Sequence, residues 1–461
     1  MLYEELDDRF GRRKKRTVIF GMAGGTPPTP PTPPTPSVLE EKALNFYDFE
    51  GTLVASYDAD EIAGLEELPE APDHSADEVP LTFEEWNWTL EEIKEYHTEL
   101  PDNKIDVGAT YHPTDGKSHA IFNIENDNDT NGVQIAMGTG TIEWGDGLSD
   151  SPTASSLTPV THVYARKGRY HCIIDSDITP VSATTSTAFA NSMTLCKLEE
   201  FYMASKLEHS SMSEKAFAFC HTLKRITIPS SLATLGKSAL TTCESLQFIV
   251  LPKSITTIAE ESFRYCRNLK KILFSESLVT IGNYSLSYVR KLEIPTFPRN
   301  LERINDHAFD GGCLNGDLIL PRGLESLGNG AFQECFLSTV ELNGPVAMTS
   351  RAFASNPNLK KISIPEGVTL IPASTCLSCY SLQRVELPSS ITEIGNYAFN
   401  SIGALSVIYV KATTPPTLGS SYALPAVIEI QKIYVPAESV EAYKSATNWS
   451  NYAEKIEAIP A

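Results

Sequence analysis

The stretch Leu359-Lys-Lys-Ile-Ser-Ile-Pro365 returns 23 residues later as Leu382-Gln-Arg-Val-Glu-Leu-Pro388, and the pattern recurs through the C-terminal half of the chain. The residue before the proline serves as marker, at Ile228, Leu251, Phe274, Ile294, Leu320, Leu342, Ile364, Leu387 and Val410. Its steps are 23, 23, 20, 26, 22, 22, 23 and 23 residues. Such a period predicts a solenoid, in which each unit buries its apolar face by stacking on its neighbours. Solenoids present long concave surfaces, so the repeat favours binding over catalysis.

Each unit has the same internal order. A turn leads into Ala-Phe, as at Ala398-Phe399, and a Leu follows the Phe after six residues. The Leu-x-x-Ile-x-Ile segment then alternates apolar and polar residues, which predicts a short half-buried strand ended by proline. This order resembles the BspA-like leucine-rich repeat family, found on surface proteins of gut and oral bacteria, in some protists and in phage-encoded proteins. The resemblance covers residues 186–461 and implies a C-terminal cap around Trp449.

The acidity of the chain is concentrated in one segment. Of a net charge of -21 over 461 residues, residues 37–182 hold 7 basic and 30 acidic residues, whereas residues 183–461 hold 24 of each. Such a field repels nucleic acid and anionic membrane, so we expect neither as a partner. No run of 18 apolar residues occurs, and we therefore expect no membrane span.

Composition shifts predict several domains in a chain of this length. We expect an N-terminal anchor peptide over 1–25, a Pro/Thr-rich polyproline II linker over 26–37, a small acidic α+β module over 38–112, a β-sandwich over 113–182 and the repeat solenoid with its cap over 183–461. The fold class is therefore multidomain and mainly β. The motif Trp144-Gly-Asp-Gly147, followed by His162-Val-Tyr164, resembles the PKD-like fold, whose domains usually act as spacers.

Side chains that flank the buried Ile of each predicted strand point to the surface of the sheet. One column of these positions is rich in basic residues, and the neighbouring column carries apolar groups near its middle. The predicted binding stripe comprises Arg225, Phe248, Lys271, Lys291, Lys361, Arg384 and Tyr409. A basic stripe beside an apolar patch favours recognition of an anionic glycan or protein. The alternative is an ordinary solvated strand face.

A basic run precedes the linker, formed by Arg12, Arg13, Lys14, Lys15 and Arg16. We interpret it as an anchor that contacts an acidic surface of a larger assembly, held at a distance by the stiff linker. The alternatives are a nucleic-acid or localisation patch, or a disordered tail.

Asp127, Asp129 and Asn131, followed by Gly132, match the first half of a calcium loop. The twelfth position is Gly138 instead of the required Glu, so an Asn-Gly hairpin turn is the alternative. We expect no other cofactor.

Six of the nine cysteines occupy one position of the repeat, with Cys220, Cys243 and Cys266 at steps of 23 residues. This spacing predicts a buried column of small apolar side chains and no disulfide framework. Cys376 and Cys379 look like a metal or redox pair but occupy the Phe and Cys positions of their unit, which favours a structural role.

The segment Asp48-Phe-Glu-Gly-Thr resembles the signature of haloacid dehalogenase-type phosphatases, in which the first Asp is the nucleophile. Glu50 stands at the second acidic position, and the module is too short for that fold, so a hairpin turn is expected. Trp86 and Trp88 are candidates for stacking on sugars, although core positions are the more ordinary role in a small module.

These features together predict a non-enzymatic surface-binding protein. Because the start of the chain is a poor secretory signal, our first hypothesis is a phage virion fibre or decoration protein, folded in the host cytoplasm and oligomeric if it is a fibre. It would dock through its N-terminus and attach to a bacterial surface glycan or protein. The alternatives are a bacterial adhesin, on the cell surface or secreted, and a hydrolase acting on surface glycan or phosphate.

Overall fold

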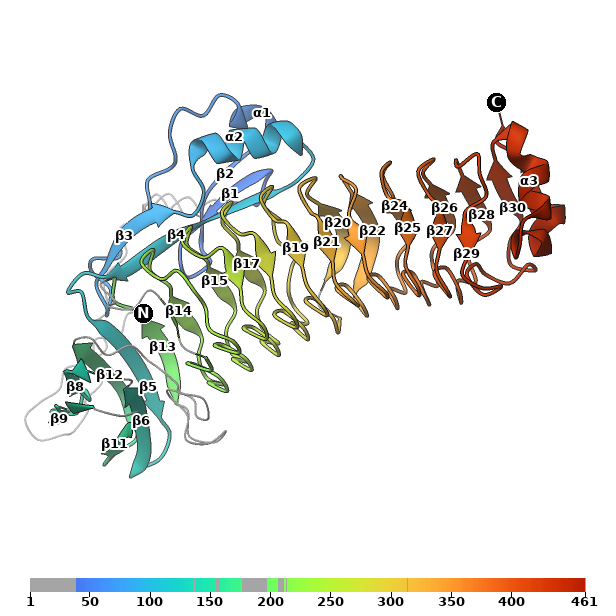
Figure 1. Ribbon diagram of the computed structural model, residues 1–461. Helices are drawn as coiled ribbons and strands as arrows, with labels where there is room; N and C mark the ends of the chain where they lie inside the picture. Colours follow the sequence, from blue (N-terminus) through green and yellow to red (C-terminus); the bar gives the residue numbers. More distant parts are fainter. Residues whose placement is uncertain are drawn as a thin grey trace, which may run out of the picture. The chain divides into compact units, whose positions relative to one another are not determined.

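The structure, a computed structural model, describes residues 39–135, 138–151, 153–154, 158–175, 197–205, 211–212, 214–312 and 314–460. Residues Leu39–Ala461 form one compact unit. It is mainly β, and a solenoid of about 11 turns with repeats of about 23 residues occupies 200–458 (Figure 1). The predicted fold class is confirmed. The predicted anchor and linker lie outside the described residues.

The N-terminal module, residues 39–113, is a four-stranded sheet packed against α2. It contains β1 (Leu44–Tyr47), β2 (Leu53–Tyr57), α1 (Ala59–Ile62), β3 (Leu81–Trp86), α2 (Leu90–Glu99) and β4 (Ile105–Pro113), in the strand order β2-β1-β4-β3. The helix α2 begins at a capping box, Thr89-x-x-Glu92, where the Thr89 hydroxyl accepts from the Glu92 amide at 3.2 Å. Trp88 and Ile93 are fully buried in the core of this module, so packing holds the helix in place.

The second segment contributes strands to three sheets, two of them two-stranded, β10-β7 and β11-β6. Its strands are β5 (Ser118–Ile124), β6 (Asp129–Ile135), β7 (Gly138–Thr139), β8 (Thr141–Glu143), β9 (Ser149–Asp150), β10 (Thr153–Ala154), β11 (Thr158–Tyr164) and β12 (Gly168–Asp175). The Tyr164 ring of β11 lies 4.3 Å from the Tyr170 ring of β12, and its hydroxyl donates to the Trp144 carbonyl at 3.1 Å. The His162 ring stacks on Trp144 at 5.0 Å. The predicted Trp, His and Tyr positions thus form one aromatic core.

The sheet of this second segment continues directly into the solenoid. Its strand order is β14-β13-β5-β12-β8-β9, with β13 (Leu198–Tyr202) antiparallel to β5 and parallel to β14 (Arg225–Thr227). The first repeat strand is therefore paired on both sides. This arrangement protects an edge that would otherwise be open to aggregation.

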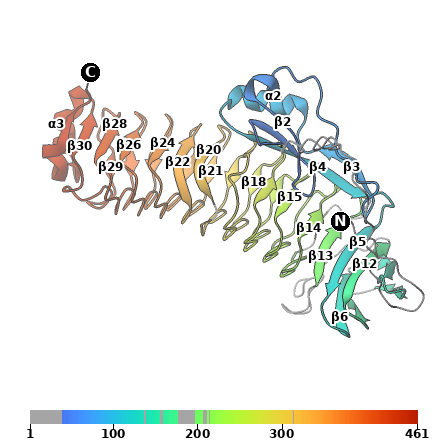
Figure 2. The same ribbon diagram turned by 180° about the vertical axis from the view of Figure 1, so that it is seen from behind.

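Most units of the solenoid carry a main strand, and most from β16 onward carry a shorter second strand on another face (Figures 1 and 2). The remaining main strands are β15 (Phe248–Val250), β17 (Lys271–Leu273), β20 (Asn315–Leu320), β22 (Phe336–Leu342), β24 (Lys361–Ser363), β26 (Arg384–Leu387), β28 (Val407–Val410), β30 (Lys432–Val435) and β31 (Ile456–Ala458). The second strands are β16 (Thr257–Ile258), β18 (Thr280–Ile281), β19 (Arg303–Ile304), β21 (Ser326–Leu327), β23 (Ala347–Met348), β25 (Leu370–Ile371), β27 (Glu393–Ile394) and β29 (Thr417–Leu418). The pairs within these two sets of solenoid strands are parallel, because each unit repeats the path of the one before.

The cysteine column has a hydrogen-bonding role. The Cys335 thiol donates to the Phe309 carbonyl at 3.1 Å, and the Cys379 thiol donates to the Phe353 carbonyl at 3.2 Å. Asn356 takes the same place in another unit, where its amide donates to the Phe332 carbonyl at 2.8 Å. The seven described cysteines are buried and unbridged, as the spacing predicts.

The predicted C-terminal cap is confirmed. It consists of η1 (Ala437–Ser439), α3 (Val440–Ser445) and η2 (Trp449–Lys455), followed by β31, which pairs with β30. The Trp449 indole donates to the Pro416 carbonyl at 2.7 Å, and the Tyr443 hydroxyl donates to the Ala412 carbonyl at 2.8 Å. Buried aromatic rings thus close the last apolar layer.

One unit has a different register from the one expected from sequence. The Leu292 amide donates to the Val289 carbonyl as the Leu269 amide does to the Cys266 carbonyl, and the Phe297 ring lies 6.2 Å from the Phe274 ring at an angle of 47°. Phe297, and not Ile294, is therefore the marker, and the steps of 20 and 26 residues become two steps of 23. In the sequence, Ile294-Pro295 has the same apolar-proline pattern that ends the strands of other units, and this caused the misalignment.

The buried proline explains why the main sheet is interrupted in that unit. Pro295 is buried at the position that Ile272 fills in the preceding strand. Because proline has no N–H to donate, the ladder stops there, and β17 and β20 belong to different sheets.

We predict that Cys335→Ala lowers the free energy of unfolding by about 2 kcal/mol, because it removes the thiol donor and leaves a cavity. Urea unfolding followed by circular dichroism measures the change. The control is Thr413→Ala at an exposed position, for which we expect no loss. Equal stability of both variants would contradict a supporting role of the thiol column.

Candidate ligand-binding face

The candidate site is the surface of the main strands, where two side-chain columns face outward. In the first column Asp317 pairs with Thr339, Thr339 with Lys361, and Arg384 with Val407. In the second, Glu386 lies between Ser363 and Tyr409 and is paired with each, and Tyr409 is paired in turn with Tyr434. These columns are the ones that strand alternation predicts.

The N-terminal module covers the first part of this face. Val250 and Leu273, in the second column, are 6% and 3% exposed and form a buried cluster with Tyr47, against which Phe248 also packs. The apolar patch expected at the middle of the column is therefore an internal contact with the chain's own module.

Two glycines allow this close approach. A Cβ on Gly108 would lie 2.6 Å from Val250 Cγ1 and 2.9 Å from Leu273 Cδ1. Gly51 has a φ of +89°, and a Cβ there would lie 2.8 Å from the Phe248 ring. Backbone and strand side chains are thus in direct contact, which leaves no room for a ligand between them.

Polar groups of the module bind the carbonyls at the ends of the covered strands. Asn87 Nδ2 lies 3.2 Å from the carbonyl oxygens of Leu251 and Leu273, and the Trp88 indole donates to the Phe274 carbonyl at 2.7 Å. Asn87 is fully buried and also accepts from the Gly108 amide at 2.7 Å. These bonds satisfy polar groups that would otherwise be buried without partners.

Lys271, one residue of the predicted stripe, is held inside this contact. Its side chain is 11% exposed, and Nζ lies 3.0 Å from Asp106, 3.1 Å from Glu41 and 2.8 Å from Glu293. Burial alone would lower the pKa of Lys271, but the carboxylates of Asp106 and Glu293 outweigh it and raise that pKa above its ordinary value. Removal of one partner from such a pair costs about 3–5 kcal/mol, so Lys271 supports the fold.

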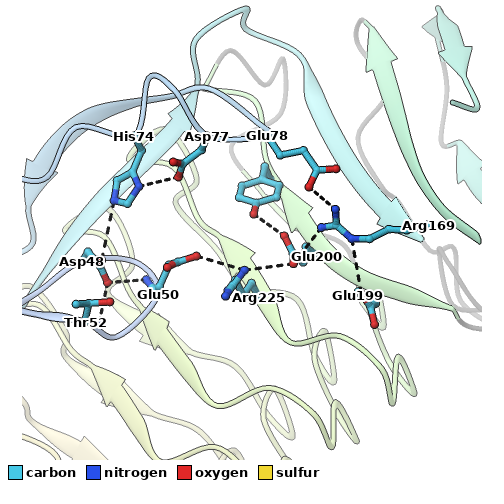
Figure 3. A network of polar contacts seen from close by, with 11 residues as sticks. Asp48, Glu50, Thr52, His74, Asp77, Glu78, Arg169, Glu199, Glu200 and Arg225 are labelled. Carbon is cyan, nitrogen blue, oxygen red and sulfur yellow. Dashed lines mark hydrogen bonds and ion pairs between the residues drawn. The ribbon is translucent and has the colours of Figure 1, made fainter. Parts of the chain in front are cut away.

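Arg225, the first residue of the stripe, joins three segments (Figure 3). Its Nη1 lies 3.3 Å from the Glu50 carboxylate and 3.2 Å from the Glu200 carboxylate. Glu200 also accepts from the Tyr202 hydroxyl at 2.6 Å and from Arg169 at 3.4 Å. Arg225 therefore links the β1–β2 hairpin, β13 and β14.

Asp48 closes the β1–β2 hairpin turn. Its Oδ1 accepts from the amides of Glu50 at 2.9 Å and Thr52 at 2.7 Å (Figure 3). Trp86 and Trp88 are 5% and 0% exposed, so neither presents a ring to a sugar. The groups on which the hydrolase alternative rests thus have structural partners in this module.

The uncovered part of the stripe lies on β24, β26 and β28. Lys361 and Arg384 are exposed, and the Arg384 guanidinium lies 4.1 Å from the centre of the Tyr409 ring. Tyr409 in turn lies 4.8 Å from Tyr434. Four of the seven predicted stripe residues are therefore not available to a ligand on this face. Arg225, Phe248 and Lys271 contact the module, and Lys291 lies off the strand face.

A groove of about 730 Å³ follows this free part of the face. Its lining includes Lys360, Lys361, Arg384 and Lys411, with the carboxylate of Glu386 between them. Glu386 pairs with Arg384 and lies 3.7 Å from Lys411. Among the described residues, Lys360 and Lys361 make no ion pair, so their charges are available to a ligand.

Lys291 borders a second groove, of about 940 Å³, with Tyr288, Arg290 and Phe336. The three-residue change of register places Ile294, and not Lys291, in line with Lys271. The proline-based alignment caused this error in the predicted stripe.

The other predicted site residues are mostly beyond what the structure describes. Arg12, Arg13, Lys14, Lys15 and Arg16 lie outside the described residues, as do the side chains of Asp129 and Asn131. Asp127 is exposed and accepts from the Lys167 amide at 2.8 Å. The described residues contain no cluster of three or more metal-ligating side chains. None of the helices in the described ranges is both long and apolar enough to cross a membrane.

Comparison with known proteins gave one family match. The sequence pattern described as "BspA type Leucine rich repeat region" matches residues 184–315 and 311–415 in six copies. No match was found among curated proteins. The comparisons gave no support for the predicted PKD-like domain.

Seven solved chains are similar to this one. A leucine rich cell surface protein from Faecalibacterium prausnitzii A2-165 has 18% identity and a TM-score of 0.28, covering 60% of this chain and 90% of its own. The T. pallidum leucine rich repeat protein has 25% identity and a TM-score of 0.30, with coverages of 40% and 83%. The pneumococcal vaccine antigen PcpA has 17% identity and a TM-score of 0.37, with coverages of 56% and 73%.

We predict that Gly108→Ala lowers the free energy of unfolding by about 1–3 kcal/mol, because its methyl group overpacks the contact with Val250. Chemical denaturation measures the loss. Gly403→Ala is the matched control, since nothing lies within 4 Å of a Cβ there. Adding Val250→Ala should make the combined loss smaller than the sum of the two single losses. Strict additivity would show that the two residues do not interact.

We predict that the contact of Glu41 with the solenoid is sensitive to acid. Burial raises its pKa, but hydrogen bonds from Lys104 and Tyr47 outweigh this and lower the pKa to about 2. A lowered folded-state pKa stabilises the protein above the ordinary value of 4.5, and this stabilisation is lost as the pH falls toward 2. Glu41→Gln should therefore flatten the dependence of stability on pH between these values. Glu40→Gln is the control, because Glu40 is also exposed but makes no ion pair among the described residues, and an equal effect of both substitutions would contradict the assignment.

Proposed function

Because the chain belongs to the BspA-type leucine-rich repeat family, we propose that it is a non-enzymatic surface-binding protein that acts as a bacterial adhesin. Its ligand is a macromolecule on a cell surface, bound through the free strand face from β22 to β30. The N-terminal module and the second segment close and support the start of the solenoid.

The observation that carries this proposal is the division of the strand face. Strands β14, β15 and β17 are covered by the module, whereas β24, β26 and β28 present a groove with exposed Lys361 and Arg384. A solenoid offers its strand face to partners because the side chains there are not needed for stacking. The free half of the strand face therefore offers a ligand an open groove lined with exposed, charged side chains.

Family membership supports the bacterial surface as the setting, because this repeat family is found on such proteins. The comparisons give no support to the virion setting. That first hypothesis rested on the segment before residue 39, which lies outside the described residues.

We predict that Lys361→Glu combined with Arg384→Glu weakens binding of the full chain to ligand-bearing cells about tenfold, because two charges are reversed in the groove. Flow cytometry with labelled protein measures binding. The control combines Arg322→Glu and Arg351→Glu, which are exposed residues outside the strands. Equal binding by both variants would place the site elsewhere.

Location is tested separately. Antibody labelling of intact cells that produce the chain should give a signal that external protease removes. A signal only after lysis would contradict the adhesin proposal.

A further inference from the structure

The pairing of neighbouring main strands is absent or reduced at two places besides the interruption at Pro295; we call these places openings. β14 and β15 belong to different sheets, and β24 and β26 share only the pair Ser363–Glu386. By comparison, β26 and β28 share four pairs. At both openings the backbone ladder is reduced and the strand face carries an arginine, Arg225 at the first and Arg384 at the second.

The first opening is filled by the chain itself. The hairpin turn at Glu50 and Gly51 lies over it, with the Glu50 carboxylate 3.3 Å from Arg225 and Gly51 against the Phe248 ring. The next basic residue of the stripe, Lys271, also meets carboxylates, from Asp106 and Glu41. Wherever the module covers a basic residue of the stripe, a carboxylate therefore neutralises it.

The second opening has the same charge but no such cover among the described residues. The groove of about 730 Å³ lies there, and its charged lining residues are four basic ones, Lys360, Lys361, Arg384 and Lys411, and two acidic ones, Glu366 and Glu386. The two carboxylates neutralise part of this charge, and Lys360 and Lys361 remain without ion pairs in the described part of the chain. In the covered half, carboxylates of the module pair with the basic residues of the stripe. By analogy, a ligand of the free half is expected to bring carboxylates to Lys361 and Arg384.

The residues of the second column indicate whether the carboxylates of the ligand belong to a carbohydrate or to a protein. In the covered half it holds Val250 and Leu273, which are buried as in the apolar centre of a protein interface. In the free half the corresponding residues are Ser363, Glu386 and Tyr409, which replace the buried aliphatic pair by polar groups and an aromatic ring. Ile364 and Pro365 add small apolar areas to the groove. A column of this kind suits a hydrated sugar chain, which has both polar groups and apolar ring faces.

Aromatic rings lie beside the charges. Tyr409 and Tyr434 are 4.8 Å apart and partly exposed, and the Arg384 guanidinium lies over Tyr409. Tyrosine rings contact the apolar faces of sugar rings, and a guanidinium has donors enough to hold a second carboxylate besides Glu386.

We propose that the groove between β24 and β26 binds a polysaccharide that carries carboxylates, such as a chain containing uronic acids. Lys361 and Arg384 bind its carboxylates, and Tyr409, which lies beside the groove next to Arg384, contacts a sugar ring with its exposed edge. This inference rests on the proposed function and names its ligand class.

The test uses the full chain and three probes in calorimetry or interferometry. Polygalacturonate carries the carboxylates, its methyl ester is the uncharged form of the same sugar chain, and polyglutamate carries carboxylates on a peptide. We expect binding to polygalacturonate, no binding to the ester and weaker binding to polyglutamate. Equal binding to polyglutamate would overturn the choice of a carbohydrate, and binding to the ester would overturn the role of the carboxylates.

Variants assign the roles. Combining Lys361→Glu and Arg384→Glu should weaken polygalacturonate binding about tenfold, and Tyr409→Ala should weaken it about threefold to tenfold. Tyr409→Ala should leave the residual polyglutamate binding unchanged, which a general loss of fold would not. Arg322→Glu combined with Arg351→Glu is the matched control.

The two proposals fail separately. If cell binding depends on Lys361 and Arg384 while no probe binds, the carbohydrate inference is wrong and the adhesin proposal stands. If polygalacturonate binds but intact cells show no surface signal, the site is correct and the proposed location is wrong.

Discussion

Every part of this protein depends on the stacking of one 23-residue unit on the next. A unit buries its Phe, Leu and Ile side chains only against its neighbours, so both ends of the stack must be closed. At the start β5 pairs with the first repeat strand, and at the end Trp449 and Tyr443 cover the last layer. Along the stack, thiol and amide donors at the cysteine position bind carbonyls of the preceding unit.

The strand face is a surface that stacking does not use, and the chain divides it into two parts. The module takes the first part through apolar contacts at Val250 and Leu273 and through the buried ion pair of Lys271 with Asp106. The second part keeps its polar and basic side chains in solvent. A single column of positions thus serves folding in one half of the solenoid and recognition in the other. Substitution of Lys271 therefore probes the fold, while substitution of Lys361 probes the ligand site.

Much of the fold was predictable from sequence because it rests on local periodicity. Short sequence patterns encode several of its features. These are the repeat period, the alternation in each strand, the capping box at Thr89 and the cysteine column. Prediction failed at Pro295, because a proline at a buried strand position has the same sequence context as one that ends a strand. The wrong register there placed Lys291 in the binding stripe.

The sequence by itself determined the solenoid, its repeat length and the two outward columns, since these follow from side-chain polarity along single strands. Only the tertiary structure decided which stripe residues are free. Arg225 and Lys271 look like Arg384 and Lys361 in sequence, yet Glu50, Glu41 and Asp106 reach the first two from segments more than a hundred residues away. Burial by a distant module leaves no periodic signal, so the location of the free groove is visible only once the chain is folded.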